Sequence, residues 1–105
     1  QELADRLSVA LDRSPLVIGE GDVKSVAWCT GAGQGYIDLA ADVGADVYVT
    51  GEVSEQTAHV ALERGIAFIG AGHHATERYG VQAVGSIAAE ELGLSHEFID
   101  IDNPA

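Results

Sequence analysis

The chain has 105 residues, of which 47% are hydrophobic, and this length and composition predict a single α/β domain, residues 1–105, with a modest core. Its 17 acidic residues outnumber its 5 basic ones, and the formal charge of -12 disfavours binding to nucleic acids and to anionic membrane surfaces. No apolar stretch reaches the ~20 residues that a membrane span needs, and the single Cys29 cannot form an intrachain disulfide, so the expected location is a reducing cytoplasm.

Predicted helices and strands alternate along the chain. The predicted elements, in chain order, are a helix at 1–12, an extended run at 16–18, a strand at 23–30, a helix at 36–43, a strand at 45–50, a helix at 54–64, a strand at 66–69, a helix at 75–92 and a last strand at 98–101. Three of these strands are each followed by glycine and then a helix. This βα alternation predicts a three-layer α/β fold, in which a mostly parallel sheet carries helices on both faces.

The three strands of this repeat end at turns that contain glycine. These turns are Thr30-Gly31, Thr50-Gly51 and Gly70-Ala71-Gly72. Because the carboxyl ends of parallel strands meet at one edge of a sheet, we expect the three turns to lie together there. Open α/β sheets place their sites where strands end and helices begin. Any chemistry of this chain is therefore expected at that edge.

The turn after the third strand of the repeat carries the strongest candidate site. His73 and Glu77 are four residues apart, so the imidazole and the carboxylate can converge on one ion if His73 lies at or just before the start of a helix. Borderline divalent ions accept both ligand types, although a transition metal normally takes at least three protein ligands. The spacing therefore predicts half of a metal site. The alternative is that His73 and His74 only fill a polar turn between strand and helix.

Other features near this edge have competing interpretations. The glycine-rich loop 31–35 is interpreted as a tight structural turn rather than an anion cradle, because it fits neither the dinucleotide fingerprint nor a P-loop. Glu52 and Glu55 suit the start of a helix electrostatically, but Glu52 directly follows strand and glycine and is a candidate for the pocket. His59 is a second candidate for the pocket, against the alternative of a surface position. His96 is expected on the surface.

Four blocks of the sequence resemble the Nif-three-like family, also called GTP cyclohydrolase I type 2 or dinuclear metal-centre hexameric proteins. The blocks, which occur in family order, are VAWCTGAGQ at 26–34, TGEVSEQT at 50–57, GHHATER at 72–78 and FIDIDNPA at 98–105. The resemblance implies a toroidal homo-hexamer whose subunits each hold two divalent metal ions between two similar α/β halves. It also implies that His73 ligates one ion and that Glu77 bridges both, because these residues match the family's Gly-His-x-x-Thr-Glu motif.

The function that this resemblance implies is metal-dependent hydrolysis of a purine nucleotide or a similar phosphorylated substrate. The candidate ions are zinc, iron and manganese. The alternative is a non-catalytic metal-dependent assembly or regulatory protein, since family members are also described as interaction partners. Whether the chain is an enzyme therefore stays open at this point.

The resemblance covers only about the C-terminal two-fifths of a family chain. The family's other half contributes a His-His pair and an aspartate that have no counterpart here, so the chain holds two of about five ligands. We infer either a fragment or a lone half. Strands without their usual neighbours would leave an unpaired sheet edge, and we expect such a chain to self-associate. Self-association could also bring two pairs of His73 and Glu77 together.

Overall fold

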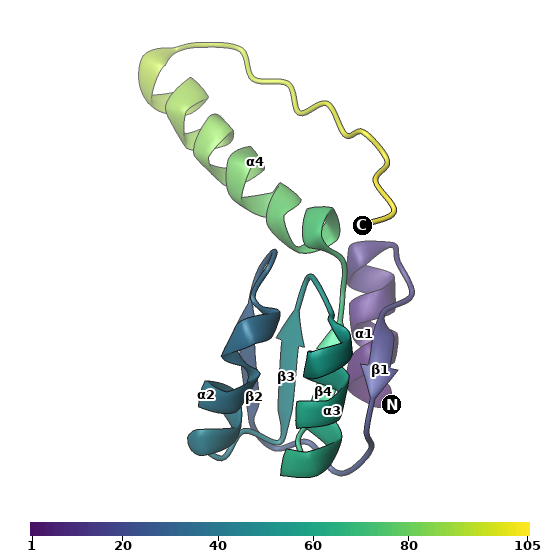
Figure 1. The fold of residues 1–105 in the computed structure, drawn as a ribbon. Coiled ribbons are helices and arrows are strands. Elements are labelled where there is room, and N and C mark those ends of the chain that lie inside the picture. The colour runs from purple at the N-terminus through teal and green to yellow at the C-terminus, as the bar shows by residue number, and fades with distance from the viewer.

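The computed structural model describes residues 1–105 and has an α/β architecture (Figure 1). Its elements are α1 (Glu2–Leu11), β1 (Leu16–Ile18), β2 (Val26–Cys29), the 3-10 helix η1 (Gln34–Tyr36), α2 (Ile37–Asp42), β3 (Val47–Thr50), α3 (Glu55–Arg64), β4 (Ala67–Gly70) and α4 (His73–Leu92). The four strands form one sheet in the order β1-β4-β3-β2. Strands β2, β3 and β4 are parallel, and β1 runs antiparallel to β4. The predicted mostly parallel sheet is confirmed.

Helices cover both faces of the sheet because successive residues of each strand point to opposite sides. On one face, Val47, Val49 and Ile69 pack against α1. On the other face, Tyr48 and Phe68 pack against α2 and α3. Phe68 is fully buried, and burying such a side chain contributes about 1.5–3 kcal/mol. The three-layer arrangement predicted from the βα alternation is therefore confirmed.

Helix α3 begins and ends where the sequence predicts. The Ser54 side chain accepts a hydrogen bond from Thr57 N at 3.2 Å, and the Thr57 hydroxyl accepts one from Ser54 N at 3.3 Å, so two free amides of the first turn are satisfied reciprocally. Gly65 ends the helix in the left-handed conformation, with φ at 65°, which glycine adopts without strain. Gly93 ends α4 in the same way.

Strand β2 forms an outer edge of the sheet. Ala27 and Cys29 point towards the layer of α2 and α3. Val26 and Trp28 point the other way, where α1 does not cover them, and Trp28 is 74% exposed. Val26 and Trp28 line an apolar cavity of about 260 Å³ beside α1.

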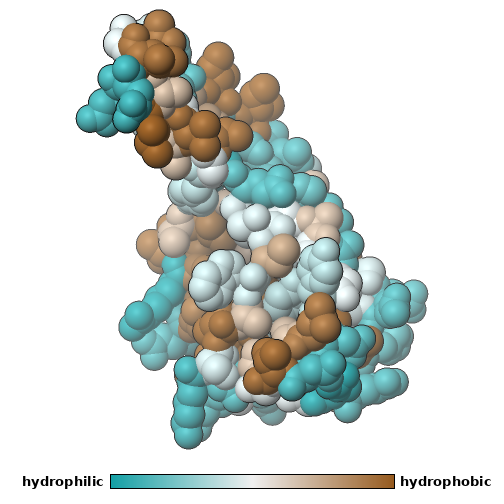
Figure 2. Space-filling view, turned by 90° about the vertical axis from the view of Figure 1, so that its left-hand side faces the viewer, coloured by the Kyte–Doolittle hydropathy of each residue, from teal (hydrophilic) through white to brown (hydrophobic).

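Helix α4 extends away from the rest of the molecule (Figure 1). The whole chain, α4 included, therefore measures 51 × 26 × 24 Å. Its start is anchored, because Ala75 is buried against α1 and Arg78 donates a hydrogen bond to Leu11 O at 2.7 Å. Farther along, its large apolar side chains are exposed, namely Val81, Val84, Ile87 and Leu92. Figure 2 shows apolar side chains gathered at this end of the molecule. No helix of the structure is both long enough and apolar enough to cross a membrane.

The prediction of a strand at 98–101 is wrong. Residues 94–105 form neither helix nor strand and run back from the end of α4 towards α1 (Figure 1). Polar contacts hold this segment, since Asp100 lies 2.7 Å from His74 Nε2 and accepts a hydrogen bond from Arg78 at 3.3 Å. The apolar residues of this segment predict a strand, but a strand needs a neighbouring strand to pair with. Arg13, between α1 and β1, also donates a hydrogen bond to Ala105 O at 2.9 Å, and the segment is not part of the four-stranded sheet.

Candidate metal site

The carboxyl ends of β2, β3 and β4 are joined by backbone hydrogen bonds. Gly51 N and Glu52 N both donate to Gly31 O, at 2.9 and 3.2 Å. Gly72 N donates to Gly51 O at 2.9 Å. The parallel register places these three turns at the same level of the sheet. This confirms the prediction that the three strand ends line one edge.

Two of these glycines are required by close packing at this edge. A Cβ on Gly51 would lie 2.6 Å from Gly31 O and 2.7 Å from His73 Cα. A Cβ on Gly31, whose φ of 66° already disfavours a side chain, would collide with the Glu77 carboxylate and lie 3.2 Å from His73 Nε2. The absence of side chains here therefore lets the start of α4 approach the ends of β2 and β3.

His73 is the first residue of α4, so it lies at the start of the helix as predicted. Its Nε2 is 3.0 Å from Glu77 Oε2, and the i,i+4 spacing therefore does bring the two side chains together. Its Nδ1 is 2.6 Å from Glu52 Oε1, a contact between residues that are 21 positions apart in sequence. The imidazole thus lies between two carboxylates, each facing one ring nitrogen. The site remains accessible, since the His73 and Glu77 side chains are 37% and 51% exposed.

The charges in this cluster shift the pKa values of His73 and Glu52 in opposite directions. The hydrogen bond that His73 donates to Glu52 raises the pKa of His73, and the negative charge of Glu77 adds to this effect. The hydrogen bond from His73 lowers the pKa of Glu52, helped by a second hydrogen bond from Gln34. The protonated imidazole and the ionised carboxylate therefore stabilise each other.

The donor atoms present fit part of a divalent-metal site. Two ligands of one zinc ion, each at about 2.0–2.1 Å, lie roughly 3.3 Å apart, and His73 Nε2 and Glu77 Oε2 are already close to that separation at 3.0 Å. Gly31 leaves the space beside both atoms free of a side chain. However, no three His, Cys, Asp or Glu side chains of this chain are arranged around one ion position. The chain alone therefore offers two donors at this position, and a complete site needs more.

The other histidines do not join this cluster. His59 lies on the exposed side of α3, with Nε2 4.0 Å from Glu55 Oε1 of the same helix. His74 faces Asp100 of the C-terminal segment. His96 is exposed, as predicted, and lies against Gly85 of α4. Of the two candidates for the pocket, the structure brings Glu52 to His73 and places His59 on the helix surface.

The glycine-rich loop 31–35 is a structural turn, because its peptide groups are bonded within the fold. Thr50 Oγ1 accepts a hydrogen bond from Gly33 N at 3.1 Å and donates one to Gly31 O at 3.2 Å. The Tyr48 hydroxyl donates to Gly33 O at 2.6 Å. An anion cradle needs free amides, and the Gly33 amide is already used.

Gln34 also belongs to the site, although its place in the sequence does not predict this. Its Nε2 donates a hydrogen bond to Glu52 Oε2 at 3.2 Å, so the carboxylate that contacts His73 is held on its second oxygen as well. The sequence contained one signal, since Gln34 directly follows the glycines at the end of a predicted strand. A glutamine in a turn is not distinctive, however, and its partner lies 18 residues away.

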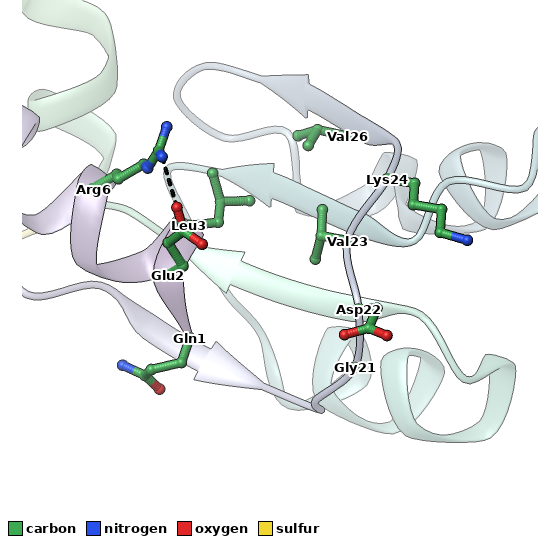
Figure 3. A pocket seen from close by; sticks show the side chains of 9 residues that line it. All are labelled: Gln1, Glu2, Leu3, Arg6, Gly21, Asp22, Val23, Lys24 and Val26. Carbon is green, nitrogen blue, oxygen red and sulfur yellow. Dashed lines mark hydrogen bonds and ion pairs between the residues drawn. The ribbon is translucent and has the colours of Figure 1, made fainter.

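Two hollows in the surface differ in their relation to this site. A cavity of about 410 Å³ adjoins His73 and Glu77, with Phe98 and Asn103 of the C-terminal segment on its wall. A larger hollow of about 710 Å³ lies between the start of α1 and the segment that leads into β2 (Figure 3). Its lining consists of Gln1, Glu2, Leu3, Arg6, Gly21, Asp22, Val23, Lys24 and Val26. It contains no histidine or cysteine, so the cavity beside His73 is the candidate for chemistry.

The sequence of the chain is similar to those of known proteins. Residues 1–104 match the model of the family described as Duf34/NIF3 (NGG1p interacting factor 3). The GTP cyclohydrolase 1 type 2 homolog of Pseudomonas aeruginosa is 54% identical over 105 residues, which cover 99% of this chain and 42% of that protein. The protein of the same name from Haemophilus influenzae is 52% identical over 108 residues, which cover 100% of this chain and 43% of that protein.

Comparison with solved structures finds the same fold. Protein ybgI, described as of unknown function, superimposes with a TM-score of 0.95 at 52% identity, over 99% of this chain and 43% of that one. TTHA1606 from Thermus thermophilus gives a TM-score of 0.87 at 36% identity, again over 99% and 43%. The chain therefore spans less than half the length of the proteins that it matches.

Proposed function

This chain is a member of the Duf34/NIF3 family, and from that premise we propose that it carries part of a divalent-metal site in a metal-dependent hydrolase. The ligands are His73 and Glu77. The observation that carries the proposal is the geometry around His73, whose Nε2 faces Glu77 while Glu52 accepts a hydrogen bond from Nδ1. Histidines that bind metals usually donate their other ring N–H to a carboxylate or carbonyl in this way. Glu52 is thus the group that orients His73, not a ligand.

Under this proposal, residues other than His73 and Glu77 supply the remaining ligands. Two donors leave several coordination positions of a transition metal unfilled. The relatives that match this chain are more than twice as long as the matched region, so a protein of that length has further residues to contribute. On the isolated chain we therefore expect weak metal binding, with most positions taken by water. Imidazole and carboxylate donors suit zinc, iron and manganese.

The proposed substrate class is a purine nucleotide, and the support for it is the name of the relatives, GTP cyclohydrolase 1 type 2 homolog. Bound divalent ions would lower the pKa of a water molecule and polarise the bond to be hydrolysed. In this chain, His73 and Glu77 hold the ions and Glu52 keeps the imidazole oriented. The adjoining cavity of about 410 Å³ has room for a ligand beside these residues.

A second candidate function is metal-dependent assembly without turnover. The observation that favours it is the exposed apolar surface of α4, on which Val84, Ile87 and Leu92 are each more than 60% exposed. Exposed apolar surface of this kind is typical of interaction sites. In that case, self-association of the chain, as a hexamer or a smaller oligomer, would be the response to metal.

The test of the metal site is metal analysis of purified variants. We expect His73→Ala and Glu77→Ala each to lower the bound zinc or manganese at least about tenfold, with circular dichroism unchanged, because both side chains are partly exposed. His96→Ala is the matched control and should retain metal, since His96 contacts α4 far from the cluster. Equal metal retention by all three variants would refute the assignment.

A second measurement separates the two candidate functions. Protein loaded with metal is incubated with GTP while its mass is followed by light scattering. Metal-dependent product release supports the hydrolase, whereas a metal-dependent increase in mass without product supports assembly. The isolated chain has an incomplete ligand set, so both measurements are also made on a relative of full length with the equivalent substitutions.

A further inference from the structure

Gln34 is held in an orientation that leaves one of its own polar atoms without a partner. It is the first residue of η1, directly after the loop that ends β2. Its Nε2 donates to Glu52 Oε2 at 3.2 Å. Its Oε1 is buried and has no hydrogen-bond partner, the only buried side-chain nitrogen or oxygen of the chain in that state. Leaving a buried carbonyl unpaired is unfavourable, so this arrangement requires an explanation.

The opposite orientation of the amide is excluded by Glu52. Rotating the amide by 180° would place Oε1 against Glu52 Oε2, and two acceptor oxygens repel each other. The N–H group therefore has to face the carboxylate. The consequence is that Gln34 supplies a donor to Glu52 at the expense of its own carbonyl group.

The two hydrogen bonds of Glu52 connect Gln34 to the candidate metal site. Gln34 donates a hydrogen bond to Glu52 Oε2, and His73 Nδ1 donates one to Glu52 Oε1 at 2.6 Å. With both oxygens held, the Glu52 carboxylate has a defined plane, and the imidazole that bonds to it presents Nε2 towards Glu77. The four side chains come from the ends of β2 and β3 and from the start of α4. The contacts form one chain, from Gln34 through Glu52 to His73.

We propose that Gln34 is a positioning residue of the metal site, which fixes the carboxylate of Glu52 so that His73 keeps its proton on Nδ1 and offers Nε2 to the ion. This inference rests on the proposed function. Outer partners of metal-bound histidines typically change metal affinity by about 10–100-fold when they are removed. Gln34 acts on His73 only through Glu52, so we expect a decrease in metal affinity near the lower end of that range.

The test compares Gln34→Met with Gln56→Met. Methionine has nearly the length of glutamine but cannot donate a hydrogen bond, and it removes the unpaired carbonyl as well. We therefore expect Gln34→Met to keep or raise the melting temperature while its zinc affinity falls about tenfold. Gln56 is exposed on α3, and the hydrogen bonds of Glu52 go to Gln34 and His73 and not to Gln56, so Gln56→Met should change neither quantity. A residue with a purely structural role would lower stability and leave zinc affinity unchanged.

A spectroscopic measurement on the metal-free protein makes the inference independent of metal loading. Long-range ¹H–¹⁵N NMR spectra show which ring nitrogen of the neutral His73 carries the proton. Wild type should favour the form with the proton on Nδ1, because Glu52 Oε1 is closer to Nδ1, at 2.6 Å, than Glu77 Oε2 is to Nε2, at 3.0 Å. Gln34→Met should increase the share of the form with the proton on Nε2. Gln34→Glu places a second carboxyl group against Glu52 and should disturb the ring further. Unchanged His73 signals in both variants would overturn the inference.

The outcomes distinguish this inference from the proposed function. If wild type binds no zinc but Gln34→Met alters the His73 signals, the positioning role holds and the metal site fails. If wild type binds zinc, and Gln34→Met matches it in both zinc affinity and His73 signals, the metal site holds and the positioning role fails.

Discussion

Replacing Gly51 by alanine tests how closely the site depends on the packing of the strand ends. The added Cβ would lie 2.6 Å from Gly31 O, 2.7 Å from His73 Cα and 2.9 Å from Gly72 O. Ordinary contacts begin at 3.4 Å. All three neighbours are backbone atoms, so no flexible side chain can move aside. The turns that end β2 and β4 must therefore move away from Gly51.

The required shift is about 0.5–0.8 Å at each contact, and overpacking of this kind typically costs about 1–3 kcal/mol. For a domain of this size, a loss of 1 kcal/mol lowers the melting temperature by about 4–8 °C, so Gly51→Ala should melt roughly 5–20 °C below wild type. The same shift moves His73 relative to Glu52 and Glu77. We therefore expect zinc affinity to fall at least about tenfold.

Thermal unfolding followed by circular dichroism and zinc titration measure these two effects. Gly80→Ala is the matched control, because Gly80 lies in α4 with no atom near its potential Cβ, and alanine is favoured there by about 0.5–1 kcal/mol. Its melting temperature should be unchanged or higher, and its zinc affinity should equal that of wild type. If Gly51→Ala melts within 2–3 °C (about 0.5 kcal/mol) of wild type and binds zinc equally well, the packing argument is refuted.

The remaining predictions concern pH, a buried hydroxyl and a helix cap. The raised pKa of His73 and the lowered pKa of Glu52 mean that the ion pair between them is complete between about pH 4.5 and 6.5. The pair weakens as pH rises through the folded pKa of His73, and also as pH falls through the folded pKa of Glu52. In metal-free protein, the difference in melting temperature between wild type and Glu52→Gln should thus be largest near pH 5–6; a constant difference up to pH 9 would contradict this. Tyr48→Phe removes the hydrogen bond to Gly33 O and should cost about 1–2 kcal/mol in urea unfolding; an unchanged midpoint would show that water replaces the hydroxyl. Ser54→Ala should cost about 1 kcal/mol through loss of the α3 cap, whereas Ser54→Asp should not.

The elements that were predicted correctly are those whose signals are local. The apolar runs at β3 and β4 identify strands because a strand covered on both faces has apolar residues at nearly every position. The run at β2 also identifies a strand, although one of its faces, with Val26 and Trp28, is exposed in the structure. Gly65 and Gly93 mark helix ends because glycine adopts the left-handed conformation there without strain. His73 and Glu77 face each other because they are one helical turn apart.

The predicted strand at 98–101 shows where local signals fail. Its apolar composition is a property of the segment alone, whereas pairing requires a partner strand at hydrogen-bonding distance. In the folded chain, Asp100 is bound instead by His74 and Arg78 of α4. These contacts join residues 22 to 26 positions apart, and no periodic pattern in the sequence indicates them.

The sequence by itself determined the βα order, the sheet edge at which the strands end and one pair of site residues, because each depends on neighbours within a few positions. Only the tertiary structure decided that Glu52 orients His73, that Gln34 holds Glu52 and that His59 lies apart from them. These contacts depend on the register of β2 against β3 and of β3 against β4, which brings Gly31, Gly51 and Gly72 to one level. Register is a property of the packed sheet, since it is set by all the side chains that the layers bury together.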